Sequence, residues 1–199
     1  TVIRLITEKA LPININTLID AFLDKNDSAR SSLTNFFYER LFNYLKDLGY
    51  SNEMVDALVS SKPAQIHDIL ERLQAISEFI KLKESDTLSS ANKRVSNILK
   101  KAEKITNNPV DVSLLIENEE IMLHKALLDL EPKINQCLVK NDFVSALKNL
   151  VILNAPINNF FEKVMVNTDD TKIKNNRYSL LYKLRQNLNC VADISKLAS

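Results

Sequence analysis

Residues 33–50 read LTNFFYERLFNYLKDLGY, and the spacing of their apolar side chains decides the fold class. These side chains recur at i, i+4, i+8, i+11, i+12 and i+15, which places them on one stripe of an amphipathic helix. They are Leu33, Phe37, Leu41, Tyr44, Leu45 and Leu48. Gly49 follows directly, at the position where a glycine commonly ends a helix. The stretch therefore predicts a long helix that ends at Gly49.

The same helical spacing recurs in most of the remaining chain, and no stretch alternates strictly between apolar and polar residues. Further apolar stripes occupy residues 66–80, 91–102, 143–151, 157–164 and 173–191. The pattern predicts an all-α fold, a helical bundle of about nine or ten helices. A seam is expected near Asn107–Asp111, which would divide the chain into residues 1–106 and 107–199.

Three residues are expected to mark helix ends. Asp111 and Asp170 precede apolar stripes and are suited to accept the free N–H groups at a helix start. Pro132 lies inside an otherwise helical stretch and is expected to end one helix or to start the next, because it has no N–H to donate.

Gly49 is the single glycine in 199 residues, which excludes the glycine-built phosphate loops. A P-loop and a Rossmann fingerprint both need several glycines in one short turn, so that backbone N–H groups can approach phosphate. The chain also lacks GxSxG and HExxH motifs, and no Ser, His and Asp set suggests a triad. We therefore expect no catalytic residue in this chain.

The histidines and cysteines are isolated from one another, so no metal site is expected. Two unpaired thiols, Cys137 and Cys190, suit a reducing compartment, and we expect a cytoplasmic protein. The longest run without a charge, residues 149–161, is too short to span a membrane. The chain begins at Thr1 rather than at methionine, as expected of a piece cut from a longer protein.

The net charge is only +1, but the charges are unevenly distributed. Residues 117–131 hold five acidic side chains against Lys125, a net charge of −4. Residues 91–104 hold five basic side chains against Glu103, a net charge of +4, and residues 171–192 are basic with no acid. Two basic helices can offer a phosphate-binding face, although ordinary solvated helix faces would look the same.

The first basic helix divides into two faces at 100° per residue. One face carries the small and apolar side chains from Ala91 to Ala102, and the opposite face is almost entirely cationic. That polar face consists of Lys93, Arg94, Asn97, Lys100, Lys101 and Lys104. Lysine and arginine suit phosphate, and arginine or asparagine can also pair with a base edge. The helix is therefore a candidate surface for RNA.

The last helix places two tyrosines, Tyr178 and Tyr182, on one flank between basic side chains. Rings interleaved with cations are what single-stranded RNA binders use for stacking, although both tyrosines could instead pack under a neighbouring helix. Arg177 projects to the apolar side of the same helix, where a charge needs a partner. We expect a structural ion pair with Asp169 or Asp170 rather than an RNA contact.

Several blocks of the sequence resemble the C-terminal part of the bacterial glycyl-tRNA synthetase β subunit. They occur in family order and span essentially the whole chain. The blocks are IRLITEKALPININTLI at 3–19, FFYERLFNYLKDLGY at 36–50, ANKRVSNIL at 91–99, FFEKVMVNTDD at 160–170, NRYSLLYKLR at 176–185 and VADIS at 191–195. ANKRVSNIL and VMVNTDD are the specific blocks, whereas the leucine-rich parts are not.

The resemblance implies a module that binds the anticodon of glycine tRNA. In that family the region is similar to the helical anticodon-binding (DALR) domain of arginyl-tRNA synthetase. The β subunit joins an α subunit in an α2β2 ligase, and the α subunit uses ATP and magnesium to activate glycine. The adenylate chemistry would thus lie outside this chain.

The resemblance also implies site residues. Lys93, Arg94 and Asn97 match the family block and are the first candidates for tRNA contact, and Lys100 and Lys101 extend their face. Arg40 matches as well, but could simply pair with Glu39 or Asp47. Asn176 and Arg177 match, with a structural role favoured. Which residues read bases and which hold phosphate stays open.

A second hypothesis is a helical scaffold whose task is contact with the α subunit or with the rest of β. The acidic stretch at 117–131 would suit such a contact surface.

Overall fold

The computed structural model describes residues 2–21, 27–102 and 108–198. Within these ranges lie ten α-helices, three short 3₁₀ helices and one isolated bridge between Asn14 and Gln65, with no strand. The α-helices are α1 (Val2–Glu8), α2 (Ile15–Asp20), α3 (Asp27–Asp47), α4 (Asn52–Val59), α5 (Ile69–Ile80), α6 (Ser85–Lys100), α7 (Asn118–Val139), α8 (Phe143–Asn149), α9 (Asn154–Lys163) and α10 (Thr171–Leu188). The 3₁₀ helices are η1 (Val112–Leu114), η2 (Leu150–Leu153) and η3 (Ile194–Leu197). The all-α prediction is confirmed.

The helix ends largely follow the sequence. Gly49 has a φ of 94° and donates its N–H to the Lys46 carbonyl at 2.8 Å, so it closes α3 as expected. The side chains of Asp111 and Asp170 accept the first free N–H groups of η1 and α10. Both aspartates are N-caps, as the sequence predicts.

The expectation for Pro132 is wrong, because α7 runs through it without a break. The proline ring removes one N–H, whose partner would be the carbonyl of Leu128 one turn earlier. Pro132 and Leu128 both lie on the exposed side of α7, where water can bond to that carbonyl. On the other side, Leu130 and Ile134 are buried before and after the proline. Their packing holds both halves of α7 in one helix.

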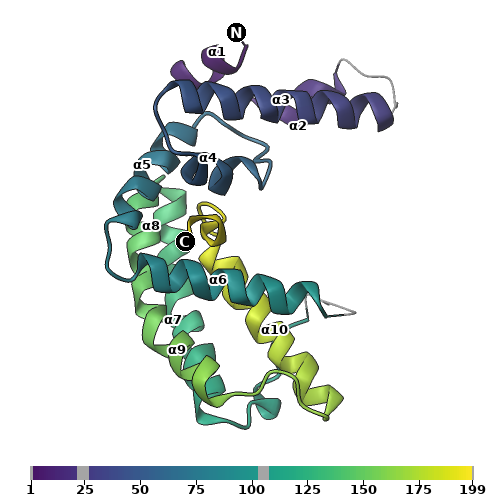
Figure 1. Cartoon of the computed structure of the whole chain (residues 1–199), viewed down its shortest axis with the longest axis vertical. Helices are drawn as coiled ribbons and strands as arrows, with labels where there is room; N and C mark the ends of the chain where they lie inside the picture. Colours follow the sequence, from purple (N-terminus) through teal and green to yellow (C-terminus); the bar gives the residue numbers. More distant parts are fainter. Residues whose placement is uncertain (1, 22–26, 103–107, 199) are drawn as a thin grey trace.

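The helices are arranged along one long axis, which is vertical in Figure 1. Helices α1–α3 lie at one end, and α7, α9 and the first turns of α10 lie at the other. Helix α6 crosses the middle of the molecule beside α10. After α10 the chain returns to the middle, where η3 packs against α4 and α6.

One hydrophobic core runs through both halves of the sequence. Helix α5 packs on α8, and α6 packs on α10 and η3, so partners come from either side of the expected seam. The division of the chain at residue 106 stays a prediction. The helices on its two sides share one core. This packing fixes α6 against α10, which is the arrangement on which the candidate site depends.

Candidate nucleic-acid interface

Helix α6 has the two faces that its sequence predicts. Val95 and Leu99 are fully buried, and Ala91 is buried at its edge. The side chains on the opposite face are all exposed where the structure describes them: Lys93, Arg94, Asn97, Lys100 and Lys101. The helix ends at Lys100 with Lys101 as its C-cap, and Lys104 lies outside the described residues.

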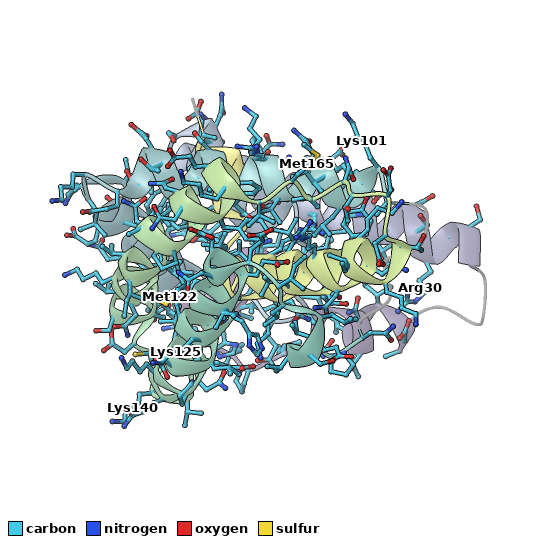
Figure 2. The ribbon with its side chains drawn as sticks, turned by 90° about the horizontal axis from the view of Figure 1, so that it is seen from below. Arg30, Lys101, Met122, Lys125, Lys140 and Met165 are labelled. Atoms are coloured by element: carbon cyan, nitrogen blue, oxygen red, sulfur yellow. The ribbon has the colours of Figure 1, made fainter. Side chains whose placement is uncertain are left out.

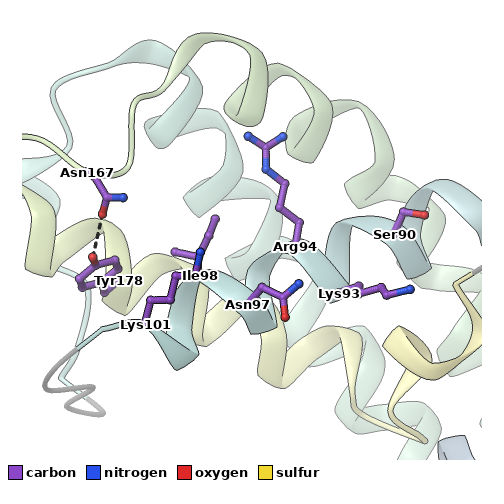
Figure 3. A pocket seen from close by; sticks show the side chains of 8 residues that line it. All are labelled: Ser90, Lys93, Arg94, Asn97, Ile98, Lys101, Asn167 and Tyr178. Atoms are coloured by element: carbon purple, nitrogen blue, oxygen red, sulfur yellow. Dashed lines mark hydrogen bonds between the residues drawn. The ribbon is translucent and has the colours of Figure 1, made fainter.

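A cavity of about 480 Å³ opens beside this face. It is lined by Ser90, Lys93, Arg94, Asn97, Ile98 and Lys101 from α6, by Asn167, and by Tyr178 from α10 (Figure 3). Cations, amides, a hydroxyl and an aromatic ring thus converge from α6 and from residues 167–178, which are far from α6 in the sequence. Such a mixture offers charge for phosphate, donors for base edges and a ring for stacking.

Tyr178 and Asn167 are bonded to each other across the cavity. The Tyr178 hydroxyl donates to Oδ1 of Asn167 at 2.8 Å. The amide nitrogen of Asn167 points away from Tyr178 (Figure 3), so this amide presents a donor that the tyrosine does not use. The bond fixes one amide orientation, which makes the donor a fixed feature of the cavity.

Arg94 is held by an aromatic ring. Its guanidinium carbon lies 4.1 Å from the centroid of the Phe161 ring, which belongs to α9. A planar guanidinium can stack on a ring with one face and keep its N–H groups free at its edges. Arg94 is exposed, so its other face remains open to a second flat group such as a base.

A second cavity, of about 830 Å³, continues from the first. Lys101 and Tyr178 line both, and the second adds Lys172 and Lys174 from the start of α10. The two basic helices therefore share one face, with Lys101 and Tyr178 at the junction. Asp111 also lines the second cavity, and hydrogen bonds from Ser113 lower the pKa of its carboxyl.

Comparison with known proteins bears on the same region. The family model of the DALR anticodon binding domain matches residues 88–194, which contain α6, Asn167 and α10. The chain belongs to the DALR anticodon binding domain family.

Similar curated proteins extend the match over the whole chain. The chain is 42% identical to the glycine–tRNA ligase beta subunit of Janthinobacterium sp. (strain Marseille) over 202 residues. It is 41% identical to that of Dechloromonas aromatica and 40% identical to that of Ralstonia nicotianae, each over 204 residues. All of the chain is covered in each case, whereas it spans 29% of the length of these relatives, in their C-terminal part. The resemblance to this β subunit is confirmed.

Three of the predicted contact residues of this DALR-family chain lie away from the two cavities. Lys100 faces a different cavity, on another side of α6. Tyr182 is half-buried and packs against the core, as Tyr178 does, but it lines neither cavity. Arg40 lies on α3, at the far end of the molecule from α9 (Figure 1), and outside the matched family region. Its guanidinium lies 5.0 Å from the centroid of the Phe36 ring rather than on Glu39 or Asp47.

The prediction that Arg177 pairs with Asp170 is wrong, because Arg177 pairs with another acidic residue. Arg177 is buried as predicted, but its Nε donates to Glu120 of α7 at 2.7 Å. Asp170 is exposed and uses its carboxylate to cap α10, whereas Arg177 points from α10 toward α7. Glu120 belongs to the acidic stretch that was considered as a protein-contact surface. Within this DALR domain its charge is neutralised internally.

Sequence reasoning missed Asn167 and Phe161, although both lie in the recognisable block at 160–170. That block carries the resemblance to the family, but neither residue lies on a cationic helix face, the feature that predicts contact residues. Ser90 was also missed, because it directly precedes the recognisable block of α6.

Two features are not found in the part of this DALR-family chain that the structure describes: a group of side chains that could hold a metal ion and a helix that could span a membrane. Within residues 2–21, 27–102 and 108–198, no three His, Cys, Asp or Glu side chains gather in a group that could hold a metal ion. No helix in these ranges has the length and apolar character needed to cross a membrane.

Proposed function

We propose that this chain is the tRNA-binding, anticodon-recognition module of a glycine–tRNA ligase β subunit and that it is itself non-catalytic. One observation carries the proposal: two adjoining cavities with cationic and aromatic walls lie between α6 and α10, inside the matched anticodon-binding region. A solvated face of one helix would present the side chains of that helix alone. Here the packing of α6 on α10 gathers them around one hollow surface.

The geometry suggests which cavity residues contact phosphates, which contact base edges and which stack on a base. The lysines that line the two cavities are suited to phosphates, which orient RNA without reading its sequence. They are Lys93, Lys101, Lys172 and Lys174. Arg94, Asn97 and the free amide nitrogen of Asn167 are suited to base edges, since they present directed donors. Tyr178, half-buried at the junction of the cavities, supplies a ring for stacking an unpaired base.

The wider assignments follow from the relatives. We propose that the partner RNA is glycine tRNA and that the α subunit of an α2β2 enzyme supplies glycine activation. ATP and magnesium would then be used in the α subunit, and the protein would work in the cytoplasm. Glycine activation, ATP and magnesium would then need no binding site in this chain.

The test is Arg94→Ala in the complete ligase. Loss of Arg94 is expected to raise the KM for tRNA while leaving glycine activation by ATP unchanged, because the residue would contact only RNA. Arg4→Ala is the matched control, since Arg4 is an exposed arginine of α1 that forms an ion pair with Glu8, away from both cavities. If adenylate formation falls as much as tRNA charging, the assignment of Arg94 is wrong.

One observation favours a second function for another face, contact with a protein. Helix α7 exposes large apolar side chains: Ile121 (46%), Met122 (54%), Leu128 (47%) and Val139 (86%). Figure 2 shows Met122, Lys125 and Lys140 on the opposite side of the molecule from Lys101. The acidic charge once expected to serve this role is partly neutralised, since Glu120 pairs with Arg177 and Glu131 with Lys183.

The two functions are separable by experiment. Leu128→Lys is expected to reduce co-purification of the α subunit, or of the rest of β, and to leave tRNA affinity unchanged. A tRNA titration at two salt concentrations provides the other arm, because binding through phosphates weakens as salt rises. No binding at low salt together with capture of α by the wild-type chain would favour the scaffold.

A further inference from the structure

Another cationic cavity lies on a different side of α6 from the two described above. Its volume is about 580 Å³, and it is walled by α4, α5, the C-terminal part of α10 and the segment that leads to η3. Lys100 lines this cavity, whereas Lys101 lines the first two. Consecutive residues of an α-helix project about 100° apart, so α6 separates the cavities and contributes a lysine to each side.

Some of the charges in this cavity are already paired. Arg72 donates to Asp68 at 2.8 Å and to the carbonyl of Val191 at 3.1 Å. Lys196 pairs with Asp56 at 3.1 Å. These residues form the wall and are held by protein partners. Asp193 also lines the cavity, and its carboxylate accepts hydrogen bonds from the N–H and hydroxyl of Ser195, which leave its negative charge in place.

Two cations in the wall have no such partner. Lys100 and Arg185 form no hydrogen bond or ion pair with any residue that the structure describes. Arg185 is half-buried, and its Nε is fully shielded from solvent without an acceptor. A partly desolvated guanidinium without a counter-charge is costly, which points to an anion that binds in the cavity.

The remaining wall groups do not oppose an anion strongly. One oxygen of Asp68 is buried without a partner, but the other is bonded to Arg72, which offsets the carboxylate charge. Burial raises the pKa of the Cys190 thiol to about 12, so that group stays neutral. Two unpaired positive charges, on Lys100 and Arg185, therefore line the cavity together with the single carboxylate of Asp193.

We propose that this cavity binds a backbone phosphate of the RNA that occupies the first cavity, through Lys100 and Arg185. The proposal rests on the function proposed above and extends the interface across α6. A helix with its side chains is about 10–12 Å wide, so a short single-stranded segment can contact both sides. Lys93 and Asn97, exposed on the surface between the two sides, lie on the path.

The experiment measures tRNA affinity of the complete ligase as a function of salt. Lys100→Gln and Arg185→Gln are each expected to weaken binding and to reduce the slope of log affinity against log salt, by up to about 0.7 to 0.9, the value for one phosphate contact. Arg185→Lys keeps the charge and is expected to retain the slope. Lys140→Gln, at the C-cap of α7, is the matched control and is expected to behave as wild type.

Two results separate this proposal from the function on which it rests. If Lys100→Gln and Arg185→Gln keep the wild-type slope while Arg94→Ala weakens binding, the second phosphate site is overturned and the function stands. If none of the three changes tRNA binding, the proposed function fails. Lys100 is exposed at the end of α6, so its variant tests the site even if Arg185→Gln does not fold.

A third arm distinguishes RNA from a small anion. The melting temperature is measured with inorganic phosphate for the wild type and for Arg185→Gln. If phosphate stabilises only the wild type while the tRNA salt slopes are equal, the cavity holds a free anion, and the RNA assignment is overturned.

Discussion

At the scale of single residues, the ion pair between Arg177 and Glu120 connects three parts of the candidate interface. The two side chains are 5% and 0% exposed, and they join α10 to the start of α7. Glu120 also accepts the backbone N–H groups of Ile116 and Glu117. Arg177 donates to the carbonyl of Met165, in the segment that carries Asn167. The pair thus positions one wall of the first cavity without facing RNA.

Arg177→Met is expected to lower the free energy of unfolding by about 3–5 kcal/mol, because it leaves the Glu120 carboxylate buried without a counter-charge. The double variant Arg177→Met with Glu120→Leu is expected to recover much of the loss, since both charges are then removed. Chemical denaturation measures both. Arg4→Met is the control, because it breaks an exposed pair with Glu8 and is expected to cost less than about 1 kcal/mol. Equal losses for Arg177→Met and Arg4→Met would contradict the argument.

His124 on α7 gives the protein a pH dependence with a definite sign. Burial lowers the pKa of this imidazole below its ordinary value of 6.5, and the nearby charge of Lys183 lowers it further. The unfolded chain therefore takes up the proton first, and stability falls as the pH drops below about 6.5. Urea denaturation at pH 7.5 and pH 5 is expected to show a smaller difference for His124→Gln than for the wild type. An unchanged difference would show that other groups cause the loss.

The sequence indicates that Arg177 needs a partner, but it cannot identify that partner. The apolar periodicity places Arg177 on the buried side of its helix, which is a local property. Glu120 lies 57 residues away, and only the packing of α10 on α7 brings the two together. The nearby Asp170 was therefore the natural but wrong choice.

At the scale of elements, the turn after α3 depends on the one glycine. Its φ of 94° lies in the left-handed region, and an added Cβ would meet no atom within 4 Å. Gly49→Ala is therefore expected to cost about 1–2 kcal/mol through backbone strain alone. Thermal or chemical denaturation measures this. Ala10→Gly, at another positive φ of 47°, is the control and is expected to stay within about 0.5 kcal/mol of wild type. If Gly49→Ala is as stable as wild type, the turn does not depend on glycine.

Helix α7 is expected to become more stable without its proline. Pro132→Ala restores an N–H that can bond to the Leu128 carbonyl and removes a residue that disfavours helix interiors by about 3 kcal/mol. The greater freedom of the unfolded chain offsets part of the gain, which leaves about 1–2 kcal/mol. The denaturant midpoint reports the change. A lower midpoint for Pro132→Ala would show that α7 needs the irregular backbone that proline imposes.

Periodicity predicted the presence of the helices better than their ends and their partners. The stripe at 33–48 gives α3 correctly, yet Leu33 and Leu48 at its two ends are 37% and 49% exposed. A 3.6-residue repeat shows which side of a helix is apolar, and it does not show how far the neighbouring helix extends. The polar face of α6 was predictable for the same reason, because the face is a property of one helix.

At the scale of the whole molecule, the cavities could not be derived from the sequence. Lys101 and Tyr178 line the same two cavities although they are 77 residues apart. Their meeting depends on how α6 packs on α10, which no local pattern encodes. The basic helices were predicted one at a time, and the shared face is a result of tertiary packing. Tertiary packing also places Arg40, on α3, away from this face.

The arrangement along one axis also implies uneven stability. Helices α1–α3 pack on one another and on α4, and few interactions tie them to the remaining helices. Three hydrogen bonds among the described residues fix them to the segment before α5. The Tyr38 hydroxyl donates to the Pro63 carbonyl at 2.8 Å, the Ile15 N–H donates to the Ala64 carbonyl at 2.7 Å, and Lys62 donates to the Asn35 side chain at 2.7 Å. Their outer surface exposes Val2, Leu5 and Phe36 at more than 50% each.

We therefore expect α1–α3 to unfold as a unit of their own, below the free energy of global unfolding. Native-state hydrogen exchange at increasing denaturant is expected to show the amides of α1–α3 opening before those of α5 and α10, because α5 packs on α4, α6 and α8, and α10 packs on α6 and α7. Tyr38→Phe removes the bond to Pro63 and is expected to lower the opening free energy of α1–α3 by about 1 kcal/mol. The opening free energies of the amides of α10 are expected to be the same in Tyr38→Phe as in the wild type. If the amides of α1–α3 exchange only with global unfolding, these helices do not unfold as a separate unit. Their contacts with α4 would then be enough to make them as stable as the core.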